Sequence, residues 1–186
     1  PIKEPHYFSK DINKNNFNNT YKNRNNFNIE NYLKTNFQEK KHIAYIENFK
    51  HYIKLFRDSN DCSILGEAST GYLYSKEAAK EIYKFNPDSK VVIILRDPVE
   101  RALSHWLMDY RLGLSRTHKC FEDILFDYDL GDNLWGGKSH TYIQIGLYFK
   151  QIKRFLDIFP EKQIKIILFE DLKNNTSNVL DDLFIF

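Results

Sequence analysis

Three short, mostly apolar runs recur along the chain at 62–65, 91–95 and 164–168, with Ser63 and Lys165 as their only polar residues. Runs of this length are typical of strands that are covered on both faces, as in a parallel sheet. The segments between them carry apolar residues at helical spacing instead. The pattern therefore predicts an α/β fold, with helices flanking both faces of a parallel sheet.

Five segments have the apolar spacing of amphipathic helices: 39–58, 75–84, 98–112, 143–159 and the stretch from about 177. We expect Ser75 to cap the second of these helices, with Ala78 and Ala79 facing inward. Asp97 is expected to cap the third, since aspartate accepts hydrogen bonds from the first turn and Pro98 suits the first helical position.

Residues 11–36 are dominated by asparagine and lysine. Asparagine side chains compete with the backbone for hydrogen bonds and favour turns. We expect a surface loop in which Phe17, Tyr21 and Phe27 pack loosely. With that loop included, residues 1–186 are expected to form a single domain, because the length suits one core.

Charge, hydrophobicity and cysteine spacing limit the kinds of function that the chain could have. The chain has 27 basic and 25 acidic residues and a formal net charge of +2. This balance gives no basis for wholesale nucleic-acid binding, so an anion site must be local. No apolar run approaches the roughly 20 residues that span a bilayer. Cys62 and Cys120 lack metal-ligand spacing, and no other metal-ligand cluster is visible, so no metal is expected.

Arg96 directly follows the apolar run 91–95. The carboxyl end of a parallel strand opens into the ligand crevice, and the next helix offers free backbone N–H groups to an anion. Ser104 lies on the second turn of that helix, and an arginine fork with a hydroxyl suits a phosphate. The alternative is that Arg96 pairs with a neighbouring carboxylate and Ser104 only faces solvent.

The segment "RDPVERALSHW", residues 96–106, resembles the 3′-phosphate-binding motif of sulfotransferases that use 3′-phosphoadenosine 5′-phosphosulfate (PAPS). That motif has the form Arg-x-Pro-x-x-Arg-x-x-Ser-x-Trp, and every anchor is present. The resemblance implies the P-loop NTPase-like sulfotransferase fold, with Arg96 and Ser104 on the 3′-phosphate. Arg101 is a third candidate for nucleotide binding; its alternative is an ion pair with Asp97 inside the helix.

The segment "KEPHYF", residues 3–8, is similar to the Lys-Glu-x-His-Phe-Phe segment of carbohydrate sulfotransferases such as the heparan sulfate enzymes. The resemblance implies that Glu4 is the general base, with His6 beside it and Lys3 assisting the phosphosulfate or the substrate. Sulfuryl transfer needs a positioned base and stabilisation of the leaving phosphate. Without the resemblance, Glu4 reads as a surface carboxylate in a frayed terminus.

The segment "GEASTGYLYS", residues 66–75, resembles the family's Gly-Glu-Lys-Ser-Pro-x-Tyr segment. Ala68 stands where relatives carry lysine, which removes a lysine contact to the substrate. Ser69 and Thr70 are the candidates to line the substrate pocket in its place.

Residues 146–172 resemble the family's Gly-x-Tyr helix and the strand after it. Tyr148 is accordingly a candidate to face the site, or else a core aromatic. Trp135, in a glycine-rich loop, is a candidate acceptor contact because sugars stack on aromatic faces; a buried Trp is the alternative.

The resemblance implies PAPS as the sulfuryl donor, a carbohydrate as the favoured acceptor, and no metal. The family fold is longer, so the phosphosulfate loop is expected before Pro1 and a closing strand after Phe186. A degenerate PAP- or PAPS-binding module is the alternative; a P-loop kinase would need a Walker lysine that the sequence lacks. The cytoplasm is expected for a bacterial source, and the Golgi lumen for a eukaryotic glycan enzyme.

Overall fold

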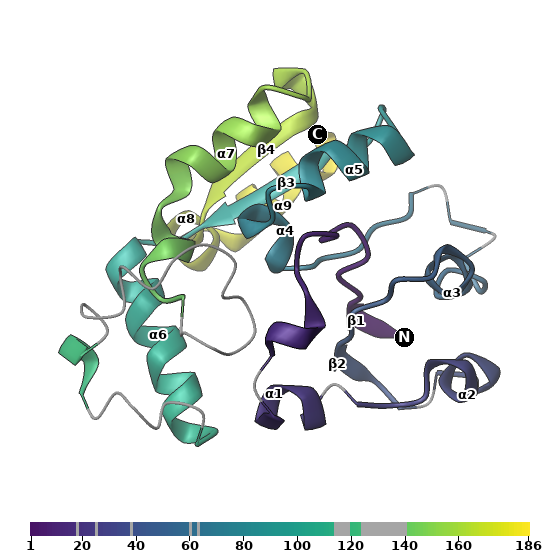
Figure 1. The fold of residues 1–186 in the computed structure, drawn as a ribbon. Coiled ribbons are helices and arrows are strands. Elements are labelled where there is room, and N and C mark those ends of the chain that lie inside the picture. Colours follow the sequence, from purple (N-terminus) through teal and green to yellow (C-terminus); the bar gives the residue numbers. More distant parts are fainter. Residues whose placement is uncertain are drawn as a thin grey trace.

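The computed structural model describes residues 1–17, 19–24, 26–37, 39–59, 61–62, 64–113, 120–123 and 141–186. Within these ranges the strands form two parallel pairs, β1 (Ile2–Glu4) with β2 (Lys41–Ile43) and β3 (Val91–Leu95) with β4 (Ile164–Leu168). Figure 1 shows the two pairs in separate parts of the molecule. The parallel α/β class expected from the sequence is confirmed.

The helices of the described chain are α1 (Asn19–Arg24), α2 (Ile29–Lys34), α3 (Phe49–Lys54), α4 (Gly71–Tyr74), α5 (Ala78–Phe85), α6 (Pro98–Arg111), α7 (Tyr148–Leu156), α8 (Phe169–Asn174) and α9 (Thr176–Ile185). Short 3-10 turns lie at η1 (Lys14–Asn16), η3 (Gln144–Gly146) and η4 (Glu161–Gln163). No described helix combines the length and the apolar character that a membrane crossing requires.

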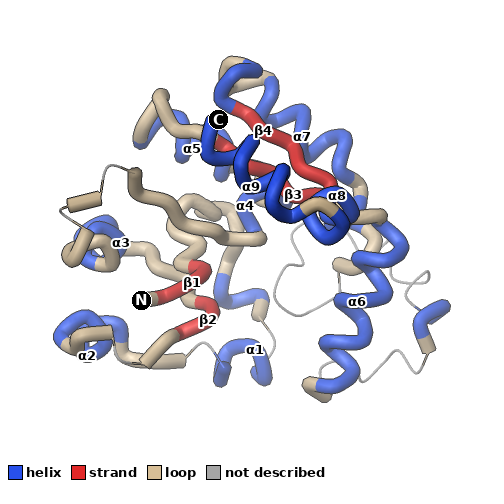
Figure 2. Tube along the Cα trace, turned by 180° about the vertical axis from the view of Figure 1, so that it is seen from behind, coloured by secondary structure: helices blue, strands red, loops and turns tan. Residues whose placement is uncertain are grey.

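The β3–β4 pair has helices on both faces. On one face, Ile93 of β3 packs with Ala79 of α5 and with Phe155 and Phe159, which lie in and just after α7. On the other face, α9 crosses the strands, as the view from behind in Figure 2 shows. The ammonium of Lys165 on β4 lies 2.5 Å from a carboxylate oxygen of Asp182 on α9. This arrangement confirms the expected layering.

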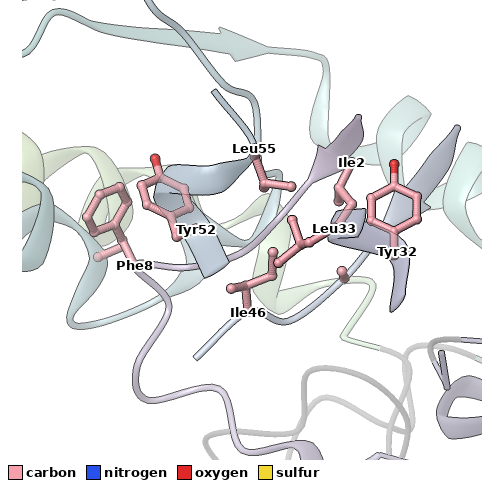
Figure 3. Packing of buried hydrophobic residues seen from close by; sticks show 9 residues of the cluster. Ile2, Phe8, Tyr32, Leu33, Ile46, Tyr52 and Leu55 are labelled. Atoms are coloured by element: carbon pink, nitrogen blue, oxygen red, sulfur yellow. The ribbon is translucent and has the colours of Figure 1, made fainter. Parts of the chain in front are cut away.

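A second core lies beside β1 and β2, and Figure 3 shows its packing. Its buried members come from segments that are far apart in sequence: Ile2, Phe8, Tyr32, Leu33, Ala44, Ile46, Tyr52, Leu55 and Ala78. Ala78 belongs to this core, whereas Ala79 belongs to the core under β3 and β4. Helix α5 therefore joins the two cores through two adjacent alanines, whose small side chains allow close packing on both sides.

The prediction of a loop over residues 11–36 is wrong for much of that segment, because η1, α1 and α2 form within it. Asparagine itself explains the difference. The Asn13 side chain accepts a hydrogen bond from the backbone of Asn15, and Asn28 caps α2 by accepting one from Asn31. An asparagine-rich stretch can thus supply helix caps as readily as turns.

The continuous helix predicted over 39–58 is also wrong. Residues 41–43 form β2, and extended backbone continues beyond it, since the N–H groups of Ala44 and Ile46 donate to the carbonyls of Glu4 and Pro5. Helix α3 begins only at Phe49. Pairing with β1 satisfies the backbone groups of this segment, so tertiary context overrides its helical periodicity.

The apolar run at 62–65 does not form a strand in its described residues. Cys62 is exposed, as are Ile64 (85%) and Leu65 (55%). Hydrophobicity alone predicted burial here, but no described element covers these side chains. The predicted Asp97 cap is confirmed, because Asp97 Oδ1 accepts from Val99 N and Glu100 N. Helix α5 begins later than predicted, with Glu77 at its N-cap position, but Ser75 Oγ still accepts from its first N–H, that of Ala78, at 3.0 Å.

Candidate functional site

Glu4 is a buried carboxylate at the end of β1, with 3% of its surface exposed. Its Oε2 accepts two hydrogen bonds from Thr70, one from the hydroxyl at 2.8 Å and one from the backbone N–H at 3.3 Å. Two motifs identified in the sequence therefore meet, although 66 positions separate these residues. The alternative of a frayed surface carboxylate is excluded.

Three nitrogen-bearing side chains surround the same carboxylate. His6 Nε2 lies 3.5 Å from Oε2 of Glu4. On the other oxygen, Oε1, His42 Nε2 lies at 3.2 Å and Lys3 Nζ at 3.5 Å. His6 is buried, whereas the side chains of Lys3 and His42 are 61% and 65% exposed. Oε2 thus faces the interior, and Oε1 faces solvent-accessible groups.

The environment keeps Glu4 ionised. Burial raises the pKa of this carboxyl, but hydrogen bonds from His6 and Thr70 and the attraction of His6 outweigh burial and lower the pKa to about 2. Hydrogen bonds to the charged form are the decisive cause, as expected for a carboxylate with several donors.

Glu67 is a second carboxylate beside this group, and sequence reasoning did not select it. The Tyr72 hydroxyl donates to Oε1, and Ser69 Oγ donates to Oε2 at 3.0 Å. Burial raises the pKa of Glu67, and the charge of Glu4 adds to the increase, while the hydrogen bonds from Tyr72 and Ser69 oppose it. The sequence signal that could have identified Glu67 is its place in the "GEASTGY" segment, directly after Gly66 and shortly before the hydroxyl residues Ser69 and Thr70.

Ser69 connects Glu67 to the segment that carries Glu4, because its Oγ also accepts a hydrogen bond from the backbone N–H of His6 at 3.0 Å. The hydroxyls of Ser69 and Thr70 are therefore engaged with Glu67 and Glu4. Their expected contact with a substrate stays a prediction, and the structure gives them a positioning role as well.

His6 has a constrained place in this network. Its backbone φ is +48°, a region that is uncommon for residues other than glycine. Its ring stacks on Tyr45 with centroids 4.5 Å apart and an interplanar angle of 11°. A Cβ at Gly71 would lie 2.8 Å from the His6 ring, so only glycine fits there without a shift.

Arg96 lies one residue beyond β3, as expected, and its guanidinium pairs with Glu100 at 3.0 Å. The same guanidinium lies over the ring of Phe169, 5.2 Å from its centroid. Ser104 is exposed on α6. Arg96 thus forms the ion pair with a neighbouring carboxylate that was the alternative to phosphate binding, and Glu100 is its partner. Arg96 is still 31% exposed, so both predicted phosphate ligands are accessible.

Arg101 and Tyr148 stabilise the N-terminal part of α6 and the turn before it. The Arg101 guanidinium donates to the carbonyl of Tyr142, which ties α6 to the segment before η3. Burial lowers the pKa of Arg101, and its interactions with Tyr148 oppose this change. The Tyr148 hydroxyl donates to the carbonyl of Arg96 at 3.0 Å. Tyr148 therefore holds the turn that carries Arg96.

Trp135, the candidate acceptor contact, lies outside the residues that the structure describes.

The donors near α6 fit a phosphate group: a partly exposed guanidinium at a strand end and an exposed hydroxyl on the following helix. Carboxylates compete for these donors, because Asp97 occupies the first N–H groups of α6 and Glu100 occupies Arg96. Over the described parts of the chain, His, Cys, Asp and Glu side chains form no group of three suited to a metal ion.

A cavity of about 760 Å³ opens beside Glu67. Lys3 and Glu67 line it together with apolar side chains such as Phe37, Phe56 and Leu65. Ala68 also lines it, so the wall is uncharged at the position where the resemblance places a lysine.

Comparison with known proteins points to one family. Residues 31–186 match the family described as "Sulfotransferase domain". Human heparan sulfate glucosamine 3-O-sulfotransferase 6 is 31% identical over 121 residues, which cover 63% of this chain and 33% of that protein. Human heparan sulfate glucosamine 3-O-sulfotransferase 3B1 is 30% identical over 142 residues, covering 74% of this chain and 34% of that protein. Mouse carbohydrate sulfotransferase 15 is 28% identical over 118 residues, which cover 56% of this chain and 21% of that protein.

The fold has a solved counterpart. A sulfotransferase from Alicyclobacillus acidocaldarius superposes with a TM-score of 0.72 at 29% identity, covering 98% of this chain and 67% of that one. The chain spans about a third or less of the length of the three curated relatives above.

Proposed function

Because the chain belongs to the sulfotransferase domain family, we propose that this protein transfers a sulfuryl group from PAPS to a hydroxyl or amine of a carbohydrate. The observation that carries the proposal is the buried, ionised Glu4, held by His6 and Thr70 where the two family-like segments meet. Relatives named as heparan sulfate and carbohydrate sulfotransferases support the carbohydrate acceptor.

Glu4 is the proposed general base. PAPS supplies the sulfuryl group, and the acceptor takes it as the bond from sulfur to the nucleotide's 5′-phosphate breaks. As the acceptor oxygen or nitrogen bonds to sulfur, Glu4 removes its proton through Oε1. Oε1 suits this role because its partners, Lys3 and His42, are exposed and can give way, whereas Thr70 holds Oε2 from the interior.

Arg96 and Ser104 are the proposed ligands of the nucleotide's 3′-phosphate, and Arg101 keeps their helix in place. Phosphate would replace Glu100 on the Arg96 guanidinium, which exchanges one charge-assisted pair for another. Lys3, exposed next to Glu4, is the proposed cation for the negative charge of the reacting group.

The alternative function is a nucleotide-binding module of the same family without turnover. The uncharged cavity wall at Ala68 favours it, because the resemblance places a lysine there. Such a protein would bind adenosine 3′,5′-bisphosphate (PAP) and transfer no sulfate.

A transfer assay with the full-length protein separates the two. It would use sulfur-labelled PAPS with glucosamine-containing oligosaccharides, galactosamine-containing oligosaccharides and a simple phenol as acceptors. We expect label on at least one oligosaccharide and little on the phenol. Label on the phenol alone would overturn the carbohydrate acceptor, and PAP binding without transfer to any acceptor would favour the non-catalytic module.

A further inference from the structure

His42 lies on the solvent side of the Glu4 carboxylate, outside every motif that the sequence singled out. It is the middle residue of β2, and β2 pairs in parallel with β1 so that Ile43 is opposite Glu4. Its Nε2 is 3.2 Å from Oε1 of Glu4, and its side chain is 65% exposed. His42 therefore connects the buried carboxylate to water.

The Glu4 carboxylate does not retain a proton well, because its surroundings favour the charged form. The hydrogen bonds that lower its pKa to about 2 stabilise the charged form, so a protonated Glu4 is unfavourable at neutral pH. A proton taken from an acceptor hydroxyl must leave Glu4 before the next turnover. The site needs a group that touches Glu4, has a free basic atom and reaches solvent.

The other groups on Glu4 do not meet these three conditions. His6 is only 3% exposed and stacks on Tyr45, so it does not reach solvent. Lys3 reaches solvent, but an ammonium group has no lone pair with which to accept a proton. Thr70 is a hydrogen-bond donor to the opposite oxygen. An imidazole accepts protons near neutral pH, and His42 presents one at Oε1.

We infer that His42 is a proton-relay residue of the transfer reaction, receiving at Nε2 the proton that Glu4 takes from the acceptor. The inference rests on the proposed function. In this sequence the acceptor O–H bond breaks, the new bond to sulfur forms, and the bond from sulfur to the nucleotide breaks. The proton passes to Oε1 of Glu4, then to Nε2 of His42, then to water, which restores an ionised Glu4 and a neutral imidazole.

The charged groups around His42 come from both strands of the pair. Glu4 and Lys3 face it from β1. On β2 it follows Lys41, whose ammonium pairs with Glu39. The relay requires a neutral imidazole, because protonation of His42 before the reaction would remove its basic nitrogen.

The test compares His42→Ala, His42→Gln and wild type in the full-length protein, with labelled PAPS and a glucosamine-containing oligosaccharide. We expect kcat to fall on the order of 100-fold in both variants with little change in KM, which is the lower end of what a proton-transfer group contributes. Free imidazole should restore part of the rate to His42→Ala, where it fits the vacated space, and none to His42→Gln. His51→Gln, a change of imidazole on α3, is the control and should stay within twofold of wild type.

The outcomes separate the relay from the proposed function. A wild-type protein that transfers no sulfate overturns both. An active wild type with unchanged His42 variants overturns the relay alone, as does a slow His42→Ala that imidazole fails to rescue, because that result indicates a structural role. If His42→Ala does not fold by circular dichroism, His42→Gln decides, since glutamine keeps a polar side chain at this position but has no basic nitrogen.

Discussion

Thr70 donates two hydrogen bonds to a single oxygen of Glu4, from its hydroxyl at 2.8 Å and from its backbone N–H at 3.3 Å. The family pattern Gly-Glu-Lys-Ser-Pro-x-Tyr has proline at the position of Thr70, and proline supplies neither donor. This chain therefore fixes its candidate base with a residue that departs from the family pattern. Ser69 adds a further constraint by accepting from the backbone of His6.

Replacing Thr70 with valine should lower the free energy of unfolding at pH 7 by about 1.5 to 3 kcal/mol, the usual value of a hydrogen bond to a charged group. Because the pKa of Glu4 lies near 2 in the folded protein and at 4.5 in a free chain, its stabilisation is present above about pH 4.5 and is lost as the pH falls through 2. Urea unfolding from pH 7 to pH 2 should therefore show the difference from wild type shrinking. Thr70→Ser keeps the hydroxyl and should stay close to wild type, whereas a Thr70→Val protein as stable as wild type would contradict the contribution of this hydrogen bond.

Replacing Glu4 with glutamine should reduce kcat by about 10²- to 10⁴-fold, the range for loss of a general base. Binding of PAP should be unchanged by calorimetry, because Glu4 is not among the proposed phosphate ligands. Glu47→Gln is a matched control, since Glu47 is an exposed carboxylate paired with Lys14. A normal rate in Glu4→Gln would remove Glu4 as the base.

Replacing Arg96 with alanine should weaken PAP binding by about 2 to 3 kcal/mol, the value of a charge-assisted contact. This corresponds to roughly 30- to 150-fold in Kd by calorimetry. Arg111→Ala, at the other end of α6, should bind PAP like wild type. Equal affinities for Arg96→Ala and wild type would refute the phosphate assignment.

Replacing Glu100 with glutamine should tighten PAP binding, because it removes the carboxylate that competes for the Arg96 guanidinium. The gain should be small, up to about fivefold, since exposed ion pairs contribute about 0 to 1 kcal/mol. Titration of PAP into both proteins measures it. Weaker binding in Glu100→Gln would show that the ion pair orients Arg96 for the phosphate.

Replacing Ala79 with leucine should lower the free energy of unfolding by about 1 to 3 kcal/mol, because the extra volume has no room beside Ile93 and Phe155. Thermal unfolding measures the loss. Lys80→Leu adds the same side chain at the next, exposed position and should change stability little. Equal effects from both variants would contradict tight packing at Ala79.

Sequence patterns predicted the elements whose signals are local. The runs at 91–95 and 164–168 form β3 and β4, and Asp97 caps α6. A short, mostly apolar run and a cap followed by proline are signals that depend on few distant contacts. The strand β1 was missed, since three residues are too few for a periodic pattern. The run at 62–65 was wrongly predicted to be a buried strand, because burial depends on a covering element that the local sequence pattern does not reveal.

The candidate site was predictable only in part. Motif resemblance selected Glu4 and His6, and the structure brings them together with Thr70. No motif pointed to His42, because its role follows from the pairing of β2 with β1. The engagement of Arg101 with the carbonyl of Tyr142 likewise required the fold, since the sequence suggested a nucleotide phosphate as its partner, or Asp97 as the alternative.

The distance in sequence between Glu4 and Thr70 has a kinetic consequence. The bonds that orient the carboxylate close a loop of more than sixty residues, so their entropic cost is repaid only after the β1–β2 region and the start of α4 have come together. During refolding, enzymatic competence should accordingly emerge with the final native structure rather than with the early, locally formed helices.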